Sequence, residues 1–308
     1  MLRRCQPPDV RVSMIGAADD GACPTGDLVR PSSSRTVGAE LREAAAQPVE
    51  CALVLFSACW RDAVNITRRG SVDPTLMRPS DRSITPTVAL ITWALAWIAG
   101  QMVATALLAA SGYSRPSEAP LPLVLASTMV VWVCLLSAMA FTSRRFGCGR
   151  FVSDYGLQIR GADLFGVGIG VLCQLVIIPI VYLPLEAIWP ERFAEDQVQQ
   201  NASDLADRAS GASTFLLIMV VVIGAPIVEE LVYRGLIQRA LSSRLSTPVA
   251  VAVTAALFTL IHFRPIEYPG LAVFAVVLGV SAAATGRLGL PIAIHIGFNA
   301  TGLLMVMR

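Results

Sequence analysis

The chain has 308 residues, of which 55% are hydrophobic and 15% are charged. Soluble domains carry about 25% charged residues, and several apolar runs here reach the ~18 residues that a membrane-spanning helix requires. This excludes an ordinary soluble domain and predicts an all-α fold, a polytopic transmembrane helical bundle in a lipid bilayer. The net charge of +2 says little about partners, and no nucleic-acid partner is expected. The absence of lysine is attributed to codon usage.

Residues 1–85 are rich in arginine, proline and serine and do not resemble a membrane domain. The apolar run 51–60 within them has about ten residues, which is too short to span a bilayer. We expect a poorly ordered cytoplasmic extension. An alternative is that translation starts at Met77, which would leave only a short basic tail before the first span.

The membrane domain is expected to cover residues 86–308 with about seven spans. The expected spans are 88–110, 121–141, 164–188, a fourth that starts near 214, 248–263, 271–285 and 290–307. Arginines gather before the first span, between the second and third, and after the fourth, whereas the loop between the third and fourth is acidic. Because cytoplasmic loops carry the excess of basic residues, this predicts a cytoplasmic N-terminus and an external C-terminus.

Charged residues interrupt the fourth span, where Glu229-Glu230-x-x-x-Arg234 follows the apolar run 215–228. A charged side chain in the middle of a bilayer costs roughly 2.5–3.5 kcal/mol on insertion scales. On a helix, Glu230 and Arg234 share a face in the favourable acid-first order, and Glu229 points about 100° away from Glu230. The spacing therefore predicts a local ion pair that leaves Glu229 free to act elsewhere.

The chain has two histidines, and both fall in expected spans. His262 lies four positions after Phe258, and His295 lies four positions before Asn299, so each pair shares one helix face. These polar groups could be structural hydrogen-bond partners between helices. However, they gather with the two glutamates and the arginine in the four spans nearest the C-terminus. This concentration favours a catalytic cavity among those spans.

The chemistry that suits these groups is hydrolysis. A carboxylate or imidazole can take a proton from water, and imidazole and carboxamide donors can stabilise an oxyanion. Glu229, His262 and His295 could alternatively ligate zinc with one open position. The compact His-Glu-x-x-His motif is absent, so the zinc alternative has no local signature.

The three motifs, in this order, resemble the CAAX protease and bacteriocin-processing family of intramembrane proteases. Its eukaryotic members are the type II CAAX prenyl endopeptidases, and the resemblance covers a catalytic core of about 213–304. Many of its members are classed as metalloproteases, although a glutamate-dependent mechanism without metal is also advanced and is favoured here. The resemblance implies Glu229 as general base, His262 as the residue that positions water, and His295 and Asn299 as the oxyanion site. It implies supporting roles for Glu230, Arg234 and Phe258.

The expected function is therefore that of an intramembrane endopeptidase in a bacterial plasma membrane. It would cleave a membrane-anchored protein or peptide in a cavity open to the cytoplasm. Two alternatives remain open: a non-proteolytic scaffold or immunity protein that retains the site, and a proton-coupled transporter. The lack of an internal repeat disfavours the transporter.

The expected spans conflict with a single site. Simple alternation places Glu229 and His295 near the cytoplasmic side and His262 at the far end of the fifth span, across a core of ~30 Å. We therefore predict that the three groups converge. This requires either a fourth span longer than hydropathy suggests or a fifth segment that is short or re-entrant.

Overall fold

The computed structural model describes residues 83–307. The expected extension, apart from its last three residues, and the alternative start at Met77 lie outside the described residues. Within the described range the chain is helical and has no strand. Six helices there are long and apolar enough to cross a membrane, and a shorter apolar helix covers Thr247–Leu260. The prediction of an all-α polytopic bundle is confirmed.

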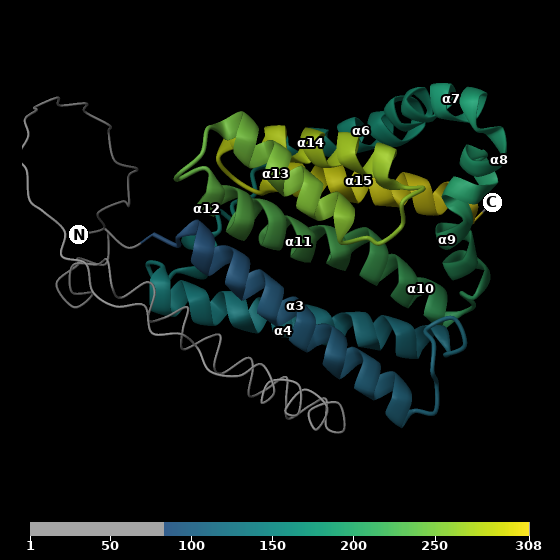
Figure 1. Ribbon diagram of the computed structural model, residues 1–308, viewed down its shortest axis with the longest axis horizontal. Coiled ribbons are helices and arrows are strands. Elements are labelled where there is room, and N and C mark those ends of the chain that lie inside the picture. Colours follow the sequence, from purple (N-terminus) through teal and green to yellow (C-terminus); the bar gives the residue numbers. More distant parts are fainter. Residues whose placement is uncertain (1–82, 308) are drawn as a thin grey trace, which may run out of the picture. The chain divides into compact units, whose positions relative to one another are not determined.

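The first two spanning helices, α3 (Pro86–Ala110) and α4 (Leu121–Phe146), pack against each other along their length (Figure 1). The Thr85 side chain caps α3 by accepting a hydrogen bond from the Val88 amide, and a proline follows in the first turn, where its missing N–H costs nothing. A Cβ at Gly100 would come within 3.0 Å of the Val131 backbone, so a small residue is needed at this crossing.

The third spanning segment is continuous from 161 to 188. It consists of a 3₁₀ turn η2 (Gly161–Leu164), α6 (Phe165–Leu172), a π-helical turn η3 (Cys173–Ile177) and α7 (Ile178–Ile188). Two glycines of α6 lie directly against α15, where any Cβ would meet backbone atoms. Two more helices, α8 (Pro190–Phe193) and α9 (Glu195–Asp207), connect this segment to the fourth.

The fourth spanning segment is the longest, with 30 residues from Ala212 to Leu241. It consists of α10 (Ala212–Ile218), η4 (Met219–Gly224), α11 (Ala225–Glu230), η5 (Leu231–Gln238) and α12 (Arg239–Leu241), of which η4 and η5 are π-helical. At 1.5 Å per residue it is about 45 Å long. The expectation of a fourth span longer than hydropathy suggests is confirmed.

The last three helices are α13 (Thr247–Leu260), α14 (Tyr268–Thr285) and α15 (Gly289–Val306). The 14 residues of α13 cover only about 21 Å, so the fifth segment is short, as one alternative predicted. The largest cluster of buried side chains surrounds α11 and η5 and takes residues from α3, α4, α13, α14 and α15. This packing fixes the face of the fourth segment that carries the predicted motif.

Four arginine-bearing segments meet at one end of the bundle. Here α4 and α12 end, α13 begins, and α14 turns into α15 (Figure 1). The contacts that join them include an ion pair between Arg287 and Asp163 and the hydrogen bond from the Leu288 amide to the Gly156 carbonyl. The short α5 (Phe151–Asp154) also lies here, and the Tyr155 hydroxyl donates to the Met139 carbonyl at 2.7 Å. We refer to this as the arginine end.

Candidate active site

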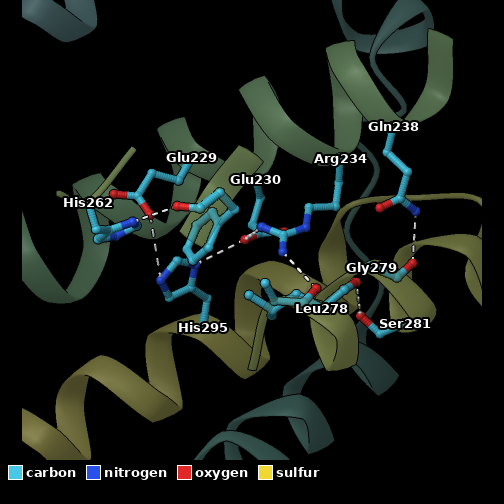
Figure 2. A network of polar contacts seen from close by, with 11 residues as sticks. Glu229, Glu230, Arg234, Gln238, His262, Leu278, Gly279, Ser281 and His295 are labelled. Carbon is cyan, nitrogen blue, oxygen red and sulfur yellow. Dashed lines mark hydrogen bonds and ion pairs between the residues drawn. The ribbon is translucent and has the colours of Figure 1, made fainter. Parts of the chain in front are cut away.

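Glu230 lies at the centre of a buried ion-pair network (Figure 2). Its side chain is fully buried, and its Oε1 accepts a hydrogen bond of 2.9 Å from Arg234 Nη1. The same oxygen lies 3.0 Å from His295 Nδ1. Arg234 Nη2 donates to the Ala275 carbonyl of α14 at 2.9 Å. The pair predicted from the four-residue spacing is present, and it joins three helices.

Glu229 approaches the other nitrogen of the His295 ring and lines a cavity of about 220 Å³ together with His262. Its side chain is 29% exposed, and its Oε2 lies 3.8 Å from His295 Nε2. The two adjacent glutamates thus lie on opposite sides of the same imidazole ring. One carboxylate is sequestered, whereas the other faces open space.

His262 follows the last turn of α13, and its Nδ1 lies 2.6 Å from the Phe258 carbonyl oxygen. Because a carbonyl only accepts, this contact assigns the proton to Nδ1 when the ring is neutral, and it leaves the Nε2 lone pair available. Glu229 and His262 therefore present two hydrogen-bond acceptors to one cavity.

Phe258 is the residue that packs these groups together. It is 1% exposed, and its ring centroid lies 4.8 Å from that of His262 and 6.0 Å from that of His295. The Arg234 guanidinium lies over the same ring at 4.8 Å, a distance typical of a cation–π contact. Phe258 therefore packs against both histidines and the arginine, and the supporting role that the resemblance implies stays a prediction.

The backbone turns abruptly after His262. Phe263 has φ = +52°, the one positive φ of a non-glycine residue in the described range. Left-handed backbone costs such a residue roughly 1–2 kcal/mol. The Phe263 ring packs against Trp97 with centroids 6.0 Å apart. This strained turn ends α13 beside the cavity, where strain is commonly found.

The short α13 explains how the three groups come together. Glu229 lies about 18 Å along its helix from Leu241, and His262 lies about 22 Å from Thr247, at 1.5 Å per residue. Both distances start at the arginine end, so the two residues reach similar depths. The structure brings Glu229, His262 and His295 together because the fifth segment stops part-way.

Asn299 lies in different surroundings. Its Nδ2 donates to the Val221 carbonyl of η4 at 2.9 Å. It lines a separate cavity of about 270 Å³ between α7, α9, α14 and α15. Asn299 is one helical turn from His295, yet the structure does not bring its amide into the cavity of Glu229 and His262.

The loop between α13 and α14 carries Glu267, which lines the same cavity as Asn299. Its carboxylate pairs with Arg264 at 2.9 Å. Burial raises the pKa of Glu267, while Arg264 and then His262 lower it in part.

The walls of the Glu229 cavity come from the first two spanning helices, which sequence reasoning did not assign to the site. They are aromatic and include Trp93, Trp97 and Trp132. Trp93 also packs edge-on against Tyr233 with ring centroids 6.4 Å apart. The sequence could have indicated this wall, because three of the five tryptophans of the chain fall in the first two expected spans.

The zinc alternative meets no matching geometry among the described residues. No group of three or more histidine, cysteine, aspartate or glutamate residues there is arranged to hold a metal ion. His295 Nδ1 is already bonded to Glu230, and its Nε2 lies 3.8 Å from Glu229. In this arrangement Glu229, His262 and His295 do not form a metal shell.

The fold and the site define a polytopic membrane protein in which a carboxylate and an imidazole, Glu229 and His262, line one cavity, and a second imidazole, His295, lies beside the carboxylate. Residues 211–301 match the family model described as type II CAAX prenyl endopeptidase Rce1-like. The matched segment runs from the start of the fourth spanning helix into α15 and supports the resemblance to the CAAX protease and bacteriocin-processing family. Comparisons with curated proteins and with solved structures give no match.

Proposed function

We propose that this protein is an intramembrane endopeptidase that hydrolyses a peptide bond of a membrane-anchored protein or peptide. The observation that supports this proposal most is the cavity shared by Glu229 and His262, with His295 beside it. The match of residues 211–301 to a family of endopeptidases points to the same reaction class. The aromatic wall suits an apolar part of the substrate.

In the proposed reaction, a water molecule donates one O–H to the Glu229 carboxylate and the other to His262 Nε2. Glu229 takes the first proton as the oxygen attacks the substrate carbonyl carbon. The tetrahedral intermediate then collapses, the C–N bond breaks, and the proton on Glu229 passes to the departing nitrogen. The products are a carboxylic acid and an amine, and no further reactant is required.

His295 is the proposed donor to the oxyanion. Its Nδ1 faces Glu230, an acceptor, so donation from Nε2 requires a proton on both ring nitrogens. Glu230 Oε1 lies 3.0 Å from Nδ1 and Glu229 Oε2 lies 3.8 Å from Nε2, so each ring nitrogen faces a carboxylate. Asn299 can donate to the oxyanion only if its amide leaves the Val221 carbonyl. Its proposed role therefore needs a test of its own, with the Asn299→Ala variant.

The test uses the purified protein in lipid vesicles with membrane-anchored candidate substrates, identified by trapping with the Glu229→Gln variant. Glu229→Gln is expected to lower the cleavage rate by about 10²–10⁴-fold, which is the usual contribution of a general base. Glu118→Gln, on the exposed loop between α3 and α4, is the matched control. If Glu229→Gln and His262→Ala both leave cleavage intact, the proposal fails.

The same assay separates the metal alternative. Loss of cleavage after strong chelation, with recovery on adding zinc, would support zinc-dependent catalysis. Cleavage that persists after chelation, in protein that contains no metal by elemental analysis, is the outcome expected for the glutamate–imidazole reaction.

A further inference from the structure

A second polar cavity lies at the arginine end, apart from the cavity of Glu229. It has a volume of about 190 Å³ and lies where η5 and α12 end, α13 begins and α14 turns into α15. Three arginines line it and no carboxylate does: Arg234, Arg239 and Arg287. The proposed reaction makes no use of this cavity.

Several buried polar atoms on its lining have no hydrogen-bond partner. They are Arg234 Nε, Arg287 Nε and Gln238 Oε1. Arg234 is 3% exposed and Gln238 is 4% exposed. Gln238 is held in place by its Nε2, which donates to the Gly279 carbonyl at 2.8 Å (Figure 2). An unmet buried donor costs about 1–3 kcal/mol, so the two arginine N–H groups favour a nearby acceptor, whereas Gln238 Oε1 is itself an acceptor and needs a donor.

The charge around the cavity is unbalanced. Glu230 pairs with Arg234, and Asp163 pairs with Arg287. No carboxylate pairs with Arg239 in the described part of the chain, and its Nη1 reaches the Gly286 carbonyl at 3.4 Å. Its guanidinium lies against Gly156, where a Cβ would come within 2.5 Å of Nη1. The lining therefore carries one net positive charge, on the exposed Arg239.

We propose that this cavity binds a phosphate group, with Arg234, Arg239 and Arg287 as donors. Guanidinium groups match the oxygens of phosphate through paired N–H donors. One net positive charge suits a singly charged phosphodiester or inorganic phosphate. Both sources are accessible at the arginine end, because it is where spanning helices begin and end, at the level of lipid headgroups.

Arg234 connects this site with the proposed catalytic groups. Its Nη1 holds Glu230, which in turn contacts His295 Nδ1. A phosphate on Arg234 Nε would bind the same guanidinium from its other side. The bound anion would therefore stabilise the orientation of Glu230 and His295.

The experiment measures the thermal unfolding midpoint (Tm) of the full chain in neutral detergent by tryptophan fluorescence, at constant ionic strength set with chloride. Inorganic phosphate is titrated first. Short-chain phosphatidylglycerol is titrated next, with phosphatidylcholine of the same chain length as reference. Arg239→Gln is compared with Arg244→Gln, since both arginines are exposed near the end of the fourth segment and only Arg239 lines the cavity.

We expect a saturable rise in Tm of at least about 2–4 °C in the parent and in Arg244→Gln. Arg239→Gln should raise the half-saturating concentration at least about tenfold, because it removes a charged donor. A response at lower concentration to phosphatidylglycerol than to phosphate identifies a lipid headgroup, and the reverse identifies free phosphate. No saturable response to either, or equal responses in the two variants, overturns the proposal and leaves a water-filled cavity. Because the readout is Tm, this result is independent of cleavage.

Discussion

At the scale of single residues, the adjacent glutamates differ in what surrounds them. Glu230 is fully buried and shares one oxygen between Arg234 and His295. Glu229 is partly exposed in a cavity. A helix turns by about 100° per residue, so neighbours in sequence face different environments. One of the two serves the stability of the fold, and the other is available for chemistry.

This difference predicts that the same substitution affects the stability of the fold unequally at the two positions. Glu230→Gln leaves Arg234 without its counter-charge and should lower the free energy of unfolding by about 3–5 kcal/mol. Glu229→Gln should change it by less than about 1 kcal/mol. Unfolding of both variants in mixed micelles, followed by circular dichroism, gives the comparison. Equal losses in the two variants would contradict the division of roles.

Asn299 offers a second prediction at this scale. If its amide serves only the Val221 carbonyl, Asn299→Ala should cost about 0.5–1.5 kcal/mol of stability with little change in kcat. If it donates to the oxyanion, kcat should fall by about 10²–10³-fold. Cleavage rates at saturating substrate, measured beside unfolding, distinguish the two. The resemblance predicts the second outcome.

At the scale of elements, the contact of α6 with α15 depends on glycine. A Cβ at Gly170 would overlap the backbone of Ile294 and Phe298, whereas a Cβ at Gly168 would meet nothing within 4 Å. Small residues let membrane helices approach closely in this way. This contact positions the helix that carries His295.

Gly170→Ala should therefore destabilise the protein by at least about 1–3 kcal/mol, and it should reduce cleavage because α15 moves. Gly168→Ala, in the same helix, is the matched control and should have little effect on either. Detergent stability and cleavage are measured for both variants. A Gly168→Ala variant as impaired as Gly170→Ala would show that helix propensity, rather than close packing, decides the outcome.

Local spacing predicted the parts of the site that lie within one helical turn. The Glu230–Arg234 pair and the shared face of Phe258 and His262 follow from four-residue spacing. Two other features depend on packing between distant segments. The tryptophans of α3 and α4 reach the cavity only through tertiary contacts. Asn299 meets the Val221 carbonyl in a π-helical stretch, where the backbone departs from the regular α-helical spacing, and no regular period predicts that contact.

At the scale of the whole membrane domain, the ends of the spanning helices differ in charge. The arginine end carries arginines from four segments. Since arginine-rich loops stay in the cytoplasm, we predict that this end is cytoplasmic. The sequence predicted that successive segments run in alternating directions, and the six spanning helices and the short α13 keep this order. The short α13 starts at the arginine end, and α14 leads back to it.

Labelling with a membrane-impermeant thiol reagent tests this orientation. A cysteine at Ser243, beside the arginine end, should react only after cells are opened. A cysteine at Ser117, in the loop between α3 and α4, should react in intact cells. Both positions are exposed, and the parent protein, with its native cysteines, gives the background. The reversed pattern would place the arginine end outside.

The short α13 also bears on the membrane itself. Val249, Val253 and Leu260 of this helix are exposed and apolar, and so is Phe263 in the turn that follows it. A helix of about 21 Å beside a hydrocarbon core of about 30 Å creates a hydrophobic mismatch, which a bilayer relieves by thinning locally. Lipid headgroups and their water would then dip toward the strained turn at Phe263. The fold would thus deform the bilayer next to its own cavity and shorten the path by which water and a peptide bond reach Glu229.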